Sequence, residues 1–270
     1  MKRGVAAAKI NLALVVGPLG NDGKHEVATV YQRITLADAI EVNPADRTHV
    51  TGFAHDTLVT RALTALTENG DVRLAARITK RIPVAAGLGG GSADAAAALR
   101  LGNALLPAPR PFERLDEIAA GLGADVPFFL RDGPQLGTGA GTDLQPLDLP
   151  QDYWVLLVLP RATAKRSTAE VYARFDAGDG ARGFDARRAR LVEVLDDISR
   201  PRDLAALPPN DLASSPLADE LRALGAFRAD VSGAGPTVYG LFLHRSDATQ
   251  ARNQFARFGR TWLTAPAWYV

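Results

Sequence analysis

The stretch that decides the fold is residues 82–93, IPVAAGLGGGSA, which runs directly into Asp94 and four alanines. A glycine inside a helix costs roughly 0.5–1 kcal/mol relative to alanine, so we expect the glycines to form a loop outside the helix. The alanines predict a helix over residues 92–106, with Ser92 as its N-cap and Asp94 in its first turn. Such a loop presents backbone N–H groups and the positive end of a helix dipole together, which favours an anion.

Three interpretations of this loop compete. A plain turn between a strand and a helix accounts for the glycines alone. A dinucleotide-binding fingerprint needs a third glycine or alanine where Ser92 stands, and it belongs at a first strand-to-helix turn. A P-loop ends in Gly-Lys-Ser/Thr, but no lysine occurs between Lys80 and Lys165. The pattern P-x-x-x-G-L-G-G-G-S-A therefore favours a phosphate-binding loop of another type, with the plain turn as the alternative.

Composition limits the class of protein. Of the residues, 47% are hydrophobic and 23% are charged, which is enough apolar material for an ordinary globular core. The length of 270 residues predicts about two domains. A formal net charge of +1, without a dense Lys/Arg stripe, gives no reason to expect a nucleic-acid partner. Cysteine is absent, which excludes disulfides and cysteine-bound metals. No apolar run of about 18 residues occurs, so we expect no membrane span.

The N-terminal residues 9–16 predict a strand with one functional face. Three residues, Ile10, Leu12 and Leu14, alternate with Lys9, Asn11 and Ala13. Successive side chains of a strand point to opposite faces, so Lys9 and Asn11 share a face. These two polar residues also interrupt the apolar start, which is not typical of a signal peptide, and we expect a cytoplasmic protein.

The rest of the chain mixes predicted helices and strands without strict alternation, which favours the α+β class. The predicted helices span 56–69, 92–106, 111–122, 168–175 and 187–199, one beginning at Ser215-Pro216, and 247–258. The predicted strands span 27–42, 74–79, 153–159 and 238–243, with a last one near Trp262. The glycine-rich residues 133–141, GPQLGTGAG, predict a loop and a domain boundary nearby.

Three stretches spread along the chain resemble the motifs of one family. They are residues 8–12 (AKINL), 83–93 and 231–237 (VSGAGPT). In order and spacing they are similar to the motifs of the GHMP kinases, the superfamily of galactokinase, homoserine kinase, mevalonate kinase and phosphomevalonate kinase. The resemblance implies a two-domain α+β fold, with an N-terminal domain like ribosomal protein S5 over residues 1–145 and a C-terminal α/β sandwich over residues 146–270.

Within that superfamily the chain is most similar to the kinases of the non-mevalonate isoprenoid route, whose acceptor is 4-diphosphocytidyl-2-C-methyl-D-erythritol. The discriminating stretches are DGKHE at 22–26, the glycines at 89–91, GADVPFF at 123–129, STAEVY at 167–172 and NDL at 210–212. The resemblance implies ATP-dependent phosphorylation of the 2-hydroxyl of that acceptor. It also implies Mg²⁺ carried with ATP rather than on a protein metal site, small-molecule partners only, and a monomer or weak homodimer.

The family's catalytic and ATP-binding residues match particular positions of this chain. Asp125 matches the acceptor of the hydroxyl proton, and Lys9 matches the cation beside it, which would keep that carboxylate ionised. The ATP-binding loop matches Pro83, Val84, Ala85, Ala86, Gly87, Leu88, Gly89, Gly90, Gly91, Ser92, Ala93 and Asp94. Ala85 and Ala86 stand where many members have glycines. The third-motif loop matches Ser232, Gly233 and Gly235.

The acceptor-binding residues match less completely. They are Asn11, Lys24, His25, Thr168 and Tyr172. Family members usually have D-G-Y-H, whose tyrosine stacks on the cytosine, and this chain has Lys24 there. The resemblance implies that Tyr172 is the remaining ring that stacks on the cytosine and that His25 contacts the edge of the pyrimidine. Lys24 has three possible places: over the base, on the diphosphate, or in water.

Two other functions stay open at this point. One is a GHMP kinase whose acceptor has no cytidine, which the missing tyrosine would suit. The other is a nucleotide-binding protein without catalysis, against which the joint presence of Lys9, Asn11 and Asp125 argues.

Overall fold

The computed structural model describes residues 1–21, 23–54, 56–68, 70, 72–161 and 167–268. Asp22 of the D-G-x-H stretch and Asn69, the expected end of the first helix, lie outside these residues. The helices are α1 (Leu58–Thr67), α2 (Gly90–Asn103), α3 (Phe112–Leu122), α4 (Thr168–Ala177), α5 (Phe184–Asp196), α6 (Pro216–Ala223), α7 (Arg245–Phe255) and the 3-10 helices η1 (Pro127–Leu130) and η2 (Pro201–Ala206). Ser215 caps α6, as the sequence predicts.

The strands form two sheets. The first has the order β3-β4-β2-β5-β6, with β1 also paired to β2, and the second has the order β10-β7-β9-β8. The strands are β1 (Lys2–Leu19), β2 (His25–Ala45), β3 (His49–Thr51), β4 (Arg73–Thr79), β5 (Gln135–Thr138), β6 (Asp143–Pro146), β7 (Trp154–Pro160), β8 (Arg228–Val231), β9 (Val238–Phe242) and β10 (Gly259–Thr264). Mixed helices and mostly antiparallel sheets confirm the predicted α+β class.

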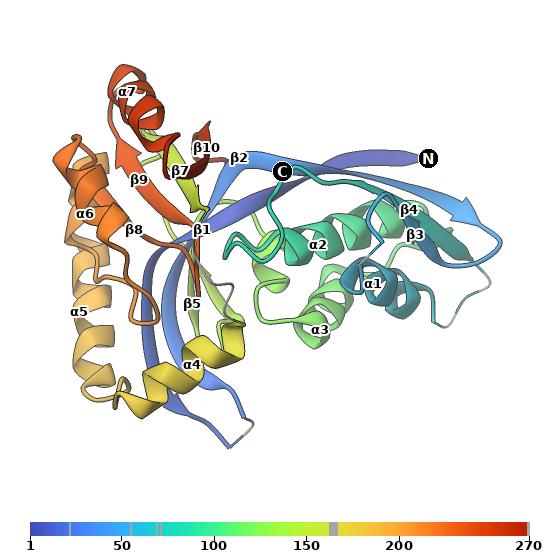
Figure 1. The fold of residues 1–270 in the computed structure, drawn as a ribbon. Coiled ribbons are helices and arrows are strands. Elements are labelled where there is room, and N and C mark those ends of the chain that lie inside the picture. Colours follow the sequence, from blue (N-terminus) through green and yellow to red (C-terminus); the bar gives the residue numbers. More distant parts are fainter. Residues whose placement is uncertain (22, 55, 69, 71, 162–166, 269–270) are drawn as a thin grey trace.

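A long hairpin of β1 and β2 connects the two halves of the molecule (Figure 1). Helix α2 packs on both strands of the hairpin, α1 and α3 pack on α2, and α5 packs on β1. One apolar core fills the space between the first sheet and α1–α3, and a second fills the space between the hairpin, β7, β9 and α5. The strand face that carries Lys9 and Asn11 therefore lies where the two halves meet.

A β-bulge corrects the predicted faces of the first strand. Asn11 pairs with Tyr31 and Ala13 with Val30, so Leu12 is an extra residue without a partner on β2. A bulge of one residue inverts the alternation that follows it. Ala13 consequently joins the core that contains Ile10, and Leu14 lines the same cavity as Lys9 and Asn11. The prediction that Leu14 and Ile10 share a face is wrong for this reason.

Helix α2 begins two residues earlier than predicted. Its N-cap is Gly89, not Ser92, and Gly89 has a left-handed φ of 67°. A Cβ at Gly89 would lie 2.9 Å from the Phe129 ring, and one at Gly90 would lie 2.9 Å from Ile82 Cγ2. These close contacts explain the glycines at the N-cap and at the first position of the helix. Asp94 consequently lies in the second turn rather than the first.

The glycine-rich residues 133–141 are not a loop throughout. Their centre is strand β5, which pairs with β2 through Thr29, Val30 and Tyr31. The prediction of an open connection fails because Gly137 and Gly141 are required by close packing: a Cβ at either would lie within 2.8 Å of the Tyr31 side chain. The first sheet continues to Pro146, after which β7 begins the second sheet at Trp154.

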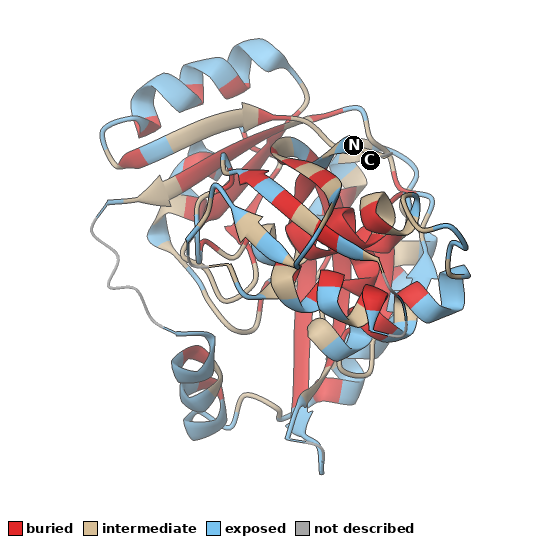
Figure 2. Cartoon of the chain, turned by 90° about the vertical axis from the view of Figure 1, so that its right-hand side faces the viewer, coloured by how far each residue is buried: buried red, intermediate tan, exposed pale blue. Residues whose placement is uncertain are grey.

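Burial differs sharply between the elements (Figure 2). Strands β8 and β9 are buried throughout, the middle of β1 is buried, and eight residues of α2 are buried. Helix α4 buries only Val171 and Phe175 and otherwise lies largely exposed. Within the described ranges, no helix has the length and apolar character needed to cross a membrane.

Candidate active site

A large cavity of about 1130 Å³ lies between the hairpin, the N-terminus of α2, the 231–237 loop and α4. Most of the residues that the sequence singles out meet there. Those on its wall are Lys9, Asn11, Lys24, His25, Ala85, Gly87, Gly89, Ser92, Asp125, Thr168, Tyr172, Gly233 and Gly235. Those that do not line it are Pro83, Val84, Ala86, Leu88, Gly90, Gly91, Ala93, Asp94 and Ser232.

Lys9 is a buried cation whose position is set from several sides. Its ammonium donates to Asn11 Oδ1 at 2.6 Å, and the amide of Asn11 donates in turn to Thr29 Oγ1 at 2.8 Å. Thr29 then donates to the Ala13 carbonyl at 2.7 Å, next to the bulge. Only 4% of Lys9 is exposed. The series of hydrogen bonds from Lys9 to the Ala13 carbonyl therefore fixes both the position of the ammonium and the face that Asn11 presents to the cavity.

Asp125 lies beside this ammonium. Its Oδ2 is 3.4 Å from Lys9 Nζ, and its Oδ1 accepts a hydrogen bond of 3.2 Å from the Tyr31 hydroxyl. The Asp125 side chain is 32% exposed, toward the cavity, whereas Lys9 and Tyr31 are buried. An ionised carboxylate with a cation and a hydroxyl donor beside it is arranged to accept a proton from a group bound in the cavity.

The loop before α2 is held open toward the same cavity. Gly87 has a φ of 78°, and a Cβ there would lie 2.2 Å from the Ser232 carbonyl oxygen. The Ser232 hydroxyl donates to the Gly87 carbonyl at 2.9 Å, which joins the loop to the third motif. Because the first N–H groups of a helix lack intrahelical acceptors, those at the start of α2 are free to bind an anion.

A buried ion cluster braces this loop from behind. Lys80 bonds both Asp38 and Asp94, the latter at 2.8 Å, and Asp38 also accepts from the Ile82 backbone N–H at 2.9 Å. Burial raises the pKa of Asp94 to about 7, against the lowering effect of Lys80. Asp94 thus faces away from the cavity and links α2 to β2 and to the chain before the loop.

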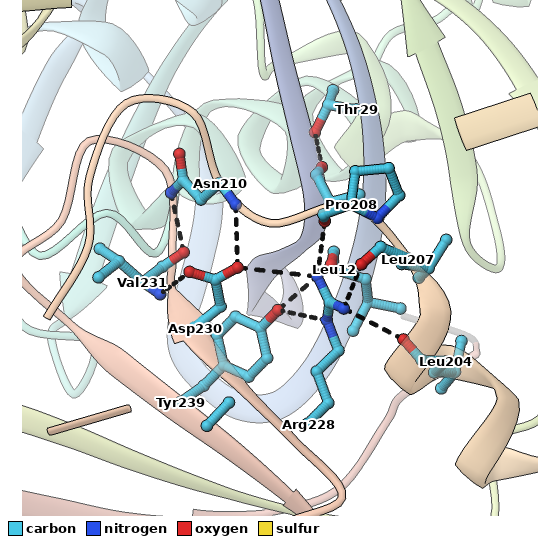
Figure 3. A network of polar contacts seen from close by, with 12 residues as sticks. Leu12, Thr29, Leu204, Leu207, Pro208, Asn210, Arg228, Asp230, Val231 and Tyr239 are labelled. Carbon is cyan, nitrogen blue, oxygen red and sulfur yellow. Dashed lines mark hydrogen bonds and ion pairs between the residues drawn. The ribbon is translucent and has the colours of Figure 1, made fainter. Parts of the chain in front are cut away.

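The third-motif loop is held by a second buried network (Figure 3). The amide of Asn210 donates to the carbonyls of Val231 and Gly233, at 2.9 and 2.7 Å. Asp230 accepts from the Asn210 backbone N–H at 2.9 Å and lies 3.7 Å from Arg228. Tyr239 donates to the Leu12 carbonyl at 3.3 Å, at the bulge. This network therefore connects Gly233 with the strand that carries Lys9 and Asn11.

The end of the cavity beside α4 is aromatic. His25 stacks on Tyr172 with ring centroids 4.8 Å apart, and its Nδ1 lies 2.9 Å from the Gly17 carbonyl oxygen. Its Nε2 is 3.5 Å from Asp176 on α4. Burial, together with the charge of Asp125, raises the pKa of Tyr172 to about 12, so it is a neutral ring at neutral pH. Lys24 also lines this end, beside His25.

Sequence reasoning missed Tyr31, Thr29, Asn210 and the Lys80 cluster. Tyr31 pairs directly with Asn11 across the hairpin, so the hairpin register was the signal that would have placed it beside the predicted polar face. Asn210 lies in the NDL stretch, but only the tertiary contact with Gly233 shows what its amide does. Among the residues described, no group of three or more His, Cys, Asp or Glu side chains could hold a metal ion.

Two family models match the chain. The model described as "GHMP kinases N terminal domain" matches residues 57–133, and "GHMP kinases C terminal" matches residues 202–261. A curated relative from Bacillus pumilus, a 4-diphosphocytidyl-2-C-methyl-D-erythritol kinase, is 35% identical and covers 94% of this chain and 92% of its own. One from Corynebacterium efficiens, with the same name, is 39% identical and covers 92% and 86%.

Solved structures agree with these relatives. A crystal structure of 4-(cytidine 5'-diphospho)-2C-methyl-D-erythritol kinase is 30% identical, with a TM-score of 0.78 over 98% of this chain and 99% of that one. A crystal structure of mevalonate kinase has a TM-score of 0.75 over 98% of this chain and 99% of its own at 13% identity, and so is similar in fold.

Proposed function

This chain belongs to the 4-diphosphocytidyl-2-C-methyl-D-erythritol kinases of the GHMP family, and we propose that it transfers the γ-phosphoryl group of ATP to the 2-hydroxyl of that acceptor. One observation supports this most: Lys9 and Asp125 lie together in the same cavity as the glycine loop. Phosphoryl transfer requires a proton acceptor beside a phosphate-binding surface, because most of the catalysis is positioning and charge stabilisation.

The donor phosphates bind at the loop before α2. Gly87, Gly89 and Ser92 line the cavity there, and Gly233 and Gly235 face them from the third motif. The helix dipole and unpaired N–H groups of α2 stabilise negative charge at this point. The Lys9 ammonium lies between the loop and Asp125, where it can neutralise charge on the transferring group.

The acceptor hydroxyl reacts at Asp125. The hydroxyl proton passes to the Asp125 carboxylate, the hydroxyl oxygen forms the new bond to the γ-phosphorus, and the bond to the β–γ bridging oxygen breaks to release ADP. Asn11 shares the strand face of Lys9 and contacts the reacting part of the acceptor. The cytosine lies at the other end of the cavity, with Tyr172, His25, Thr168 and Lys24.

A Mg²⁺ ion held by the triphosphate would neutralise phosphate charge during transfer. Mg²⁺ usually keeps several waters and takes one or two carboxylates besides substrate phosphates. Ser92 and Asp125 are oxygen-bearing side chains on the cavity wall, and that donor set fits an ion brought in with ATP.

We further propose two domains, residues 1–145 and 146–270, which place the cavity where they meet. The first sheet ends at Pro146, and the second begins at Trp154. The active site is built from one chain, which suits a monomer or weak homodimer, and the reaction takes place in the cytoplasm, where ATP is supplied.

A coupled ADP-release assay tests the function. We expect turnover with 4-diphosphocytidyl-2-C-methyl-D-erythritol and none above background with homoserine, mevalonate or galactose. Lys24, in place of the family's tyrosine, favours the second candidate, a GHMP kinase with a non-cytidyl acceptor, and turnover of one of the other three alone would establish it. ATP binding without turnover of any acceptor would contradict a kinase.

A further inference from the structure

The Tyr31 ring is enclosed on several sides. Phe128 stacks on it with centroids 4.9 Å apart and an interplanar angle of 27°. Lys9 Nζ lies 5.5 Å from its centroid. Its edge is bounded by Gly137 and Gly141, where an added Cβ would lie 2.7 Å from Tyr31 Cε2 and 2.8 Å from its hydroxyl oxygen. Gly137 and Gly141 therefore form one wall of a slot for this ring.

The slot is fixed on its other side by a buried arginine. Arg33, fully buried on the same strand, lies 5.3 Å over the Phe128 ring. Its guanidinium donates to the Arg131 carbonyl at 2.6 Å, just after η1. The 3-10 helix η1 begins two residues after Asp125. The contacts of Arg33 and Phe128 therefore fix the position of the Tyr31 ring and also that of the segment that carries Asp125.

The Tyr31 hydroxyl is a permanent donor. Burial, and then the negative charge of Asp125, raise the pKa of Tyr31 well above its ordinary value. The phenol therefore stays protonated, and its hydroxyl donates a hydrogen bond of 3.2 Å to Asp125 Oδ1. Each carboxylate oxygen of Asp125 thus has one contact: Oδ1 with the Tyr31 hydroxyl and Oδ2 with the Lys9 ammonium, 3.4 Å away. Because a carboxylate oxygen can accept two hydrogen bonds, the group keeps acceptor sites for a ligand in the cavity.

We propose that Tyr31 is a positioning residue that holds the Asp125 carboxylate in the orientation in which it accepts the proton of the acceptor hydroxyl. This inference rests on the proposed kinase function. The hydroxyl proton moves to the Asp125 carboxylate, the new O–P bond forms, and ADP leaves with the electron pair of the broken bond. Tyr31 lines the same cavity but acts in this account through its hydrogen bond to Asp125.

The test is a double-mutant cycle with Tyr31→Phe and Asp125→Asn. Phenylalanine keeps the stack on Phe128 and removes only the hydroxyl. Loss of a hydrogen bond to a charged group predicts a fall in kcat of about tenfold or more, with the KM for ATP unchanged. On the Asp125→Asn background the same change should alter kcat by less than about twofold, because the two residues act as a unit.

The matched control is Tyr153→Phe. Tyr153 is also buried, but its hydroxyl has no hydrogen-bond partner among the described residues. Losing that hydroxyl should leave kcat unchanged, and it should not lower the thermal midpoint, because a buried hydroxyl without a partner is itself destabilising. If Tyr31→Phe fails to fold, Gly137→Ala serves instead, since its Cβ displaces the ring and should lower kcat only when Asp125 is present.

The outcomes separate this inference from the function on which it rests. If wild type does not turn over the acceptor, the proposed function fails. If wild type turns over and Tyr31→Phe lowers kcat equally with aspartate or asparagine at position 125, or does not lower it, Tyr31 does not position Asp125. A change confined to the KM for ATP would likewise overturn the proposal.

Discussion

The two ends of the cavity are built in different ways. The phosphate end consists of backbone: glycines in close contact with Ser232, Ile82 and Phe129, braced by the buried Lys80 cluster. The acceptor end consists of side chains from a hairpin tip and from α4, which buries only Val171 and Phe175. At the first end, a Cβ added at Gly87, Gly89 or Gly90 would lie less than 3.0 Å from a neighbouring atom, whereas the second end has Lys24 where the family usually has a tyrosine.

This difference assigns the two ends different tasks. A backbone surface binds phosphate whatever the acceptor is, which suits a donor site common to a superfamily. We propose that the side chains of the hairpin tip and of α4 select the acceptor. Lys9 and Asp125 lie between the two ends, and the predictions below test whether the three regions act separately.

The largest effect is expected between the ends, at Asp125. Asp125→Asn should lower kcat at least about a hundredfold, the scale of a positioned base, and leave the KM for ATP near that of wild type. Steady-state kinetics and thermal melts measure both. The control is Asp148→Asn, an exposed carboxylate outside the cavity, which should match wild type. Near-normal turnover by Asp125→Asn would remove this residue from the mechanism.

At the phosphate end, Gly87→Ala should raise the KM for ATP by more than about tenfold, because φ is positive and the new Cβ meets the Ser232 carbonyl. Gly90 is less informative, since a Cβ there meets Ile82 and not the cavity. Gly121→Ala is the matched control, with nothing within 4 Å of its Cβ. If Gly87→Ala folds and its affinity for ATP is unchanged, the loop does not bind phosphate, and the alternative interpretation as a plain turn holds.

At the acceptor end, Tyr172→Ala should weaken acceptor binding by about 1–3 kcal/mol, the contribution of one base stacked on one ring. The loss should appear in the acceptor KM, since Tyr172 lies at the far end of the cavity from the glycine loop. Arg174→Ala, on the exposed face of the same helix, is the control. An acceptor KM equal to that of wild type would show that Tyr172 does not stack on the base.

Lys24→Tyr sharpens this test. If position 24 still faces the base, the added ring should lower the acceptor KM several-fold, to about the degree that one stacking contact supplies. A higher KM would instead place Lys24 on the diphosphate, where loss of the cation weakens binding. Titrating the salt dependence of the acceptor KM for both proteins separates a charge contact from a ring contact.

Much of the phosphate end could be predicted from sequence, because its glycines and following alanines report local geometry. The start of α2 and the position of Asp94 could not be predicted from sequence. The first depends on the packing of Gly90 against Ile82, and the second depends on the contact with Lys80, which follows the end of β4. The face of Leu14 was missed because a bulge at Leu12 depends on the Tyr239 and β2 contacts. Tyr31 was missed because its partner Asp125 is 94 residues away.

The smallest effect concerns the brace at Asp94. Since burial raises the pKa of its carboxyl from 3.8 to about 7, the folded protein binds a proton between those values that the unfolded chain does not. Stability should therefore rise as the pH falls from 8 to 5. Asp94→Asn should flatten this part of a plot of thermal midpoint against pH, by about a few degrees. Asp148→Asn should leave the slope unchanged, and an equal slope in Asp94→Asn would assign the effect to other groups.

The most direct test of the separation between the two ends is one set of KM values, for ATP and for the acceptor, in Gly87→Ala and Tyr172→Ala. The predicted result is a crossed pattern: the first variant raises only the KM for ATP, and the second raises only the KM for 4-diphosphocytidyl-2-C-methyl-D-erythritol. If either variant raises both constants by the same factor, the cavity does not divide into a backbone-built donor end and a side-chain-built acceptor end.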